Sequence, residues 1–242
     1  THDPLLTQPE KFWLDTSVFL NVIETGGVEQ RLMLAEQLGG FVADPSTSEA
    51  ERSAVVPVVL KLAVDPISAI RRALAERLVQ ITGLHADIVF TIISDEESIA
   101  LPFLALTPAL NHWQMMAVLQ VGDISRQTVL AGRPDIAPEA IAMLVRASEI
   151  DASIALLDNP AVRLGDRDYH TIYARFGQEP EVTERLLAIP TLPLDIRILH
   201  ARRVSNRMHQ LLAERGWIPA NDAADLVVDA QESAILGILF DA

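Results

Sequence analysis

The chain has 242 residues, half of them apolar, and a formal net charge of −14 at pH 7. This length and apolar content exclude a disordered chain, and the strong negative charge disfavours nucleic acid as a partner, because it repels a polyanion. The sequence contains no cysteine, which excludes disulfides and cysteine zinc sites and fits a cytoplasmic protein, and its apolar stretches are too short to span a membrane.

The amino-terminal segment, 1–64, is predicted to form longer helices than those that follow. The pattern over 30–42 is helical and ends at Asp44 and Pro45. Ser48 and Glu51 then form a capping box that opens a second helix, which runs through Leu62.

An aliphatic residue then recurs at a nearly constant interval, which indicates an internal repeat. The five positions are Leu84, Leu110, Ile136, Leu164 and Leu192. A fixed period in this range predicts an α-solenoid, in which each repeat buries its apolar face against its neighbours. We therefore expect each of these residues to be buried at a repeat junction.

Each repeat is predicted to contain two short antiparallel helices, A and B. A proline precedes the repeated aliphatic residue in four copies, as Pro108, Pro134, Pro160 and Pro190, and is expected to end helix A at a corner. The strand-like segment 88–93 occupies a helix B position, so we predict a helix there. An acidic residue also recurs at a constant interval, at the start of each predicted helix A, and we interpret these acids as helix caps. They are Asp95, Asp123, Asp151 and Glu179.

Beyond position 200 the repeat decays into two longer helices. One ends at Arg215, before Gly216, and a last helix starts at 221–222. We predict one helical-repeat domain over 1–242, with longer helices in 1–64, short repeats in 65–200 and capping helices in 201–242. The last helix carries Leu236, Ile238, Leu239 and Phe240. We expect these residues either to pack on the preceding helix or to contact a second copy or a continuation of the chain, and a homodimer is one such arrangement.

The segment 64–78 (VDPISAIRRALAERL), preceded by the segment from Thr47 to Arg52, resembles an uncharacterised bacterial family of HEAT-like helical proteins, domain of unknown function 2336. The later short repeats are similar to the leucine-rich repeat variant. The resemblance covers roughly positions 28–200, and its most specific piece runs from Arg71 to Arg77. It implies an all-α solenoid of short, two-helix HEAT-like repeats, and it implies no activity or catalytic residue.

One basic segment stands out from the acidic chain and is our candidate partner-binding site. It contains Arg197, His200, Arg202, Arg203 and Arg207, and the helical spacing places His200, Arg203 and Arg207 on one face. A solvated face is the plain interpretation, and an anion or acidic-peptide site is the functional one.

Asp166 and His170 have a metal-compatible spacing without a third ligand, so we interpret them as a helix cap and a surface pair.

These observations predict a protein-interaction scaffold or adaptor that binds a protein partner of unknown identity. The sequence offers no catalytic motif, and we predict no enzymatic activity, cofactor or metal. Two alternatives stay open. One is a HEAT-like enzyme such as a DNA-lesion glycosylase, which needs a basic groove and a catalytic carboxylate. The other is a structural or dimerisation element of a longer chain.

Overall fold

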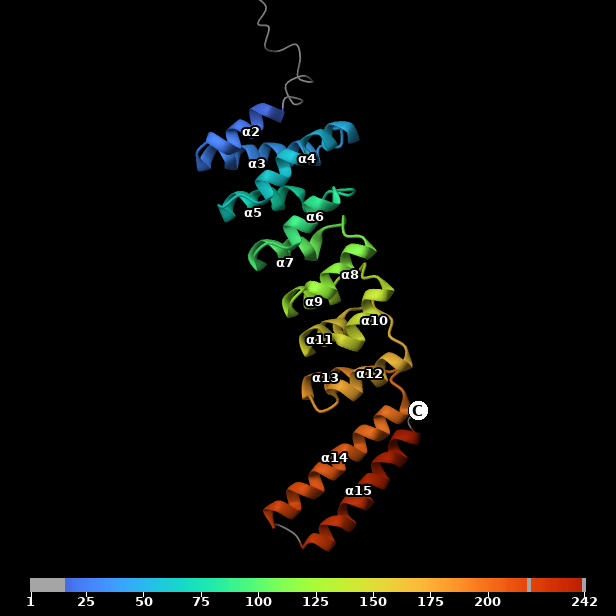
Figure 1. The fold of residues 1–242 in the computed structure, drawn as a ribbon. Coiled ribbons are helices and arrows are strands. Elements are labelled where there is room, and N and C mark those ends of the chain that lie inside the picture. The colour runs from blue at the N-terminus through green and yellow to red at the C-terminus, as the bar shows by residue number, and fades with distance from the viewer. Residues whose placement is uncertain (1–15, 217–218, 241–242) are drawn as a thin grey trace, which may run out of the picture. The chain divides into compact units, whose positions relative to one another are not determined.

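A computed structural model describes residues 16–216 and 219–240, and Figure 1 shows the order of the helices. The described residues contain fourteen α-helices and no strand, which confirms the predicted all-α class. Contacts along the chain define two compact units, 1–140 and 141–242, so the boundary lies within α10 (Pro138–Ala147). The single-domain organisation over 1–242 stays a prediction.

The first unit contains short helices whose alternate members pack against one another. Helix α3 contacts α5, α5 contacts α7 and α7 contacts α9, while α4 contacts α6. The core between them is aliphatic, and burial of each large side chain contributes roughly 1.5–3 kcal/mol. The helices are α2 (Thr16–Thr25), α3 (Val28–Ala43), α4 (Glu49–Ala63), α5 (Ser68–Leu78), α6 (Ala86–Ile93), α7 (Glu97–Leu106), α8 (His112–Val121) and α9 (Ile124–Ala131).

The second unit continues with three short helices and ends in a hairpin of two long ones. Helix α13 contacts both α11 and α12, and α14 packs along α15. The bounds are α11 (Ile150–Asp158), α12 (Asp166–Phe176), α13 (Pro180–Leu187), α14 (Leu194–Arg215) and α15 (Ala220–Phe240).

Local sequence signals account for most helix ends. The predicted capping box is present, because the Ser48 N–H donates to Glu51 Oε2 at 2.8 Å and the Glu51 N–H donates to Ser48 Oγ at 3.3 Å. Gly216 ends α14 with a φ of +61°, a left-handed conformation that glycine adopts without strain. The β-branched segment 88–93 lies in α6, as predicted from its place in the repeat.

The four marked prolines lie in equivalent corners. Each begins the turn that joins a helix A to the following helix B, namely α7 to α8, α9 to α10, α11 to α12 and α13 to α14. Two corners are further fixed by the residue before the proline, because Thr107 Oγ1 accepts from the Ala109 N–H and Asn159 Oδ1 accepts from the Ala161 N–H. Each of the four prolines therefore begins a turn between two helices, as predicted, while the repeat architecture stays a prediction.

One of the five recurring aliphatic residues was predicted wrongly, because the buried residue lies at position 162 and not at Leu164. Leu84, Leu110, Ile136 and Leu192 are buried as expected, but Leu164 is half-buried and Val162 fills the equivalent place. Val162 is the second residue after Pro160, as Leu110 is the second after Pro108. With Val162 in the series, the first three intervals become equal. The larger aliphatic side chain at position 164 obscured this regularity in the sequence.

Candidate partner-binding cleft

Three arginines of the repeats bind backbone carbonyls near the end of an earlier helix, and we call Arg126, Arg133 and Arg175 the carbonyl clamps. The Arg126 Nε donates at 2.9 Å to the carbonyl of Ile93, the last residue of α6. Arg133 donates to the Leu104 and Thr107 carbonyls at the end of α7, and Arg175 donates to carbonyls at the end of α10. Such carbonyls lack partners within their own helix, so each clamp satisfies carbonyl groups that the helix end leaves unpaired.

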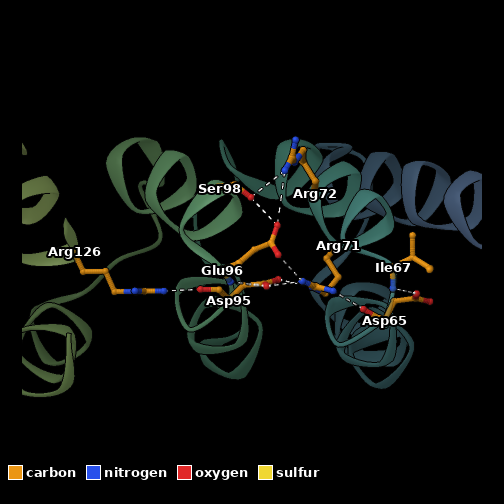
Figure 2. Close-up of polar contacts among 8 residues, drawn as sticks. All are labelled: Asp65, Ile67, Arg71, Arg72, Asp95, Glu96, Ser98 and Arg126. Carbon is orange, nitrogen blue, oxygen red and sulfur yellow. Dashed lines mark hydrogen bonds and ion pairs between the residues drawn. The ribbon is translucent and has the colours of Figure 1, made fainter. Parts of the chain in front are cut away.

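A second set of arginines pairs with acids, and Figure 2 shows it around Asp95. Arg71 donates to both carboxylate oxygens of Asp95, at 2.7 and 2.8 Å, and also to the Asp65 carbonyl at 2.7 Å. The hydrogen bond to Asp95 raises the pKa of Arg71 further above its usual range. Asp65 is buried, and its carboxylate accepts a hydrogen bond from Arg31 of α3. These pairs join α3 and α5 to the segments that precede α5 and α7, respectively, and leave no free charge on the arginines.

Two of the four periodic acids, Asp123 and Glu179, are N-cap residues of a helix, and of these only Asp123 makes a side-chain capping hydrogen bond. Asp123 Oδ1 accepts from the Arg126 N–H at 2.9 Å and caps α9. Asp95 accepts from Arg71 and from the backbone N–H of Glu96, the N-cap residue of α7, while Asp151 lies inside the first turn of α11. The Glu179 side chain makes no capping hydrogen bond to α13. The spacing is therefore regular, but the role of the carboxylate differs from one copy to the next.

The predicted basic segment lies in α14, and the structure brings four of its five residues into one cleft. His200, Arg202, Arg203 and Arg207 line a cleft of about 760 Å³ between α14, the end of α12 and the start of α13. Arg197 lies outside this lining. It donates to the Pro190 carbonyl at 2.7 Å and so stabilises a corner. Arg197 therefore behaves like the carbonyl clamps.

Arg203 lies in the wall of this cleft without a carboxylate partner. Its guanidinium carbon lies 5.0 Å from the centre of the Tyr173 ring, a cation–π arrangement. Its Nη1 atom is buried and makes no hydrogen bond among the described residues. Gly177 leaves the space for this atom, because a Cβ at position 177 would lie 2.7 Å from Nη1. The end of α12 is thus shaped around the guanidinium.

His200 contributes little positive charge to the cleft. Burial, together with the nearby charge of Arg203, lowers the pKa of His200 below its usual value. Its Nδ1 atom lies 3.3 Å from the hydroxyl of Tyr173, whose own pKa is raised by burial. At neutral pH the charge of the cleft therefore comes from the arginines.

A histidine–aspartate pair joins α12 to the start of α14. His170 Nε2 lies 2.5 Å from Asp195 Oδ2, and its Nδ1 lies 2.7 Å from the Asp166 carbonyl. The hydrogen bond with Asp195 is the main cause that raises the pKa of His170, and the same bond lowers the pKa of Asp195. The predicted surface pair of Asp166 and His170 is in fact a backbone contact, and the carboxylate partner lies 25 residues away.

Sequence reasoning missed two residues that shape the cleft. Tyr173 and Gly177 belong to α12 and its end, and neither carries a charge that marks it as functional. The one available signal was a glycine directly after an amphipathic helix, a position where glycine is common for reasons unrelated to binding.

The described residues thus form an all-helical protein in which a basic cleft lies between α12 and α14. Residues 99–241 match the family described as "Uncharacterised protein conserved in bacteria (DUF2336)", and the chain belongs to this family. The match starts later than the predicted resemblance over 28–200, excludes the string at 64–78 and includes the hairpin of α14 and α15.

Comparisons with curated proteins and with solved structures return no significant match. Among the described helices, none combines the length and apolar character that crossing a membrane requires.

Proposed function

We propose that the protein is an interaction scaffold or adaptor that binds an acidic segment of a partner protein in the cleft of α14. In this proposal the helix pairs of each unit are HEAT-like repeats of an α-solenoid, and their role is to hold the cleft residues in place. Contacts between alternate helices and the equivalent proline corners support the solenoid architecture. The proposal assigns no catalytic residue, cofactor or metal.

The observation that carries the proposal is the state of the cleft arginines. Arg202, Arg203 and Arg207 make no ion pair among the described residues, although the chain has a net charge of −14. The buried Nη1 atom of Arg203 also lacks a hydrogen bond there. A partly buried guanidinium without such a partner is costly, and a carboxylate satisfies it with a planar, two-pronged geometry. A carboxylate of the ligand therefore provides the acceptor that Arg203 lacks among the described residues.

The rest of the lining favours a peptide over a small anion. Leu199 and Val204 are exposed apolar residues of the same cleft, beside the arginines. Apolar contacts next to charged contacts suit a segment that carries both acidic and aliphatic side chains. The partner predicted here is thus an acidic, partly apolar stretch of protein.

The experiment measures binding of a fluorescein-labelled peptide of glutamate and leucine by fluorescence anisotropy. We expect the double variant R203E/R207E to bind at least about tenfold more weakly than the wild type, because two attractive charges become repulsive. The matched control is R77E/R167E, since both of these arginines are exposed and lie outside the cleft.

The control makes the same change in net charge and is expected to retain wild-type affinity. Equal losses in the two variants, or no binding by the wild type, overturn the proposal. A peptide with lysine in place of glutamate is expected not to bind, and circular dichroism verifies that both variants stay helical.

A further inference from the structure

The hairpin of α14 and α15 differs in construction from the short helices before it. The two helices have 22 and 21 residues, against 8 to 16 in the rest of the described chain. They pack along each other, yet Ile196 and Val227 are their only buried residues among the described side chains. A pair of long helices with so little burial has apolar surface left uncovered.

The uncovered surface is found on both helices. On α14, outside the cleft, the exposed apolar residues Met208 and Leu211 lie about one helical turn apart. On α15 the exposed apolar residues are Val228, Leu236, Leu239 and Phe240, and Phe240 is 85% exposed. Long helices of this kind are commonly found in bundles of four, where each helix contacts two neighbours.

The opposite charges of α14 and α15 indicate which partner suits the exposed apolar surface. Helix α14 carries five arginines, three of which line the cleft, and two acids, of which Asp195 pairs with His170. Helix α15 carries four acids and neither lysine nor arginine. Among the described residues no ion pair joins the two helices, so these charges are not neutralised within the hairpin. A basic helix beside an acidic one forms a self-complementary unit: a second copy offers an acidic α15 to α14 and a basic α14 to α15.

We propose that two copies of the chain associate through their hairpins into a four-helix bundle with two-fold symmetry. Each α14 lies between the α15 of its own chain and the α15 of the other chain. The opposite arrangement, with α14 against α14, places arginines against arginines and is disfavoured by repulsion. The exposed residues Leu236 and Leu239 form part of the core of this bundle.

The first test is the molar mass in solution, measured by light scattering after size exclusion. The wild-type chain is expected at twice its mass of 26.5 kDa. The variant L236Q/L239Q is expected at the mass of a single chain, because glutamine keeps helical propensity and charge but removes apolar contacts. The matched control V64Q/V121Q changes residues that are 63% and 88% exposed outside the hairpin, and it is expected to stay dimeric.

A wild-type chain that stays monomeric at all soluble concentrations overturns the dimer, and so does a dimer that survives L236Q/L239Q with normal helicity. The same variant keeps all cleft residues and is expected to retain binding of the acidic peptide. Failure of the dimer and failure of the proposed function are therefore distinguishable.

The second test examines which helices meet. Because the chain has no cysteine, an introduced cysteine is the only thiol in each variant. The variants are N206C on α14 and E232C on α15, and both positions are exposed. The two variants, one carrying a size tag, are mixed and treated with a flexible bis-maleimide. The mixed product is expected to exceed both self-linked products. Predominance of the product that links two α14 helices, or the absence of any linked product, overturns the arrangement.

Discussion

The arginines that bind helix-end carbonyls in the repeats differ in environment from the three cleft arginines of α14, Arg202, Arg203 and Arg207. In the repeats, Arg133 is 4% exposed and its guanidinium satisfies helix carbonyls and binds Asp135. In α14, Arg203 has a buried nitrogen with no hydrogen bond, and Arg202 and Arg207 are exposed without ion pairs among the described residues. The same side chain therefore stabilises the fold in one region and is available for a ligand in the other.

The difference has a geometric origin. In the repeats, a helix end with free carbonyls or an acid lies within reach of the arginine, as Asp95 does for Arg71. The cleft beside α14 is lined by Gly177, Pro180 and Thr183, which offer no carboxylate. The cleft arginines of α14 thus face lining residues that carry no charged acceptor.

The corner residues of the repeats are expected to give the largest effects. Leu110→Ala should lower the free energy of unfolding by about 2–5 kcal/mol, because the rigid corner cannot collapse around the cavity. Val162→Ala should cost about 1–2 kcal/mol, from roughly 0.8 kcal/mol for each methylene, and Leu164→Ala clearly less. Urea unfolding measures all three, and a loss for Leu164→Ala that matches or exceeds that for Val162→Ala contradicts the corrected register.

Arg133→Met should lower the free energy of unfolding by about 2–4 kcal/mol, since the buried carbonyls of Leu104 and Thr107 lose their donor. Arg133→Lys should show a smaller loss, because its ammonium restores a donor but reaches fewer of these acceptors at once. Urea unfolding again provides the values. If Arg133→Met costs under about 0.5 kcal/mol, the carbonyl clamps do not stabilise the repeats.

Arg203→Met should change the free energy of unfolding by less than about 1 kcal/mol, because the fold loses a cation–π contact with Tyr173 and no ion pair. The contrast with Arg133→Met is the direct measure of the difference between the two regions. The same variant should weaken binding of the acidic peptide. A stability loss as large as that of Arg133→Met shows that Arg203 belongs to the fold instead.

The smallest expected effect is the change in stability with pH that comes from the titration of His170. The pKa of His170 is raised in the folded chain, so its contribution to stability is complete below the ordinary value of about 6.5 and is lost as pH rises through the raised pKa. His200 should titrate below the ordinary value, since burial disfavours its charged form. An NMR titration, assigned with His170→Gln and His200→Gln, tests this order. The reverse order contradicts the described pairing of His170 with Asp195.

The sequence alone determined most of the helices and the prolines at the turns between them. Ser48 with Glu51, the prolines such as Pro108, and Gly216 act through the backbone close to themselves in the chain, so their effects follow from local geometry. The grouping of His200, Arg203 and Arg207 on one face also followed from helical periodicity.

The tertiary structure decided which of these residues has a partner. The carbonyl partners of Arg133 lie 26 and 29 residues away, and the carboxylate partner of His170 lies 25 residues away. The wall that faces Arg203 is supplied by Tyr173 and Gly177. Whether Val162 or Leu164 fills a corner likewise depends on the neighbouring helices. Such contacts depend on how helices pack, and the spacing of residues along one helix carries no information about what lies across from it.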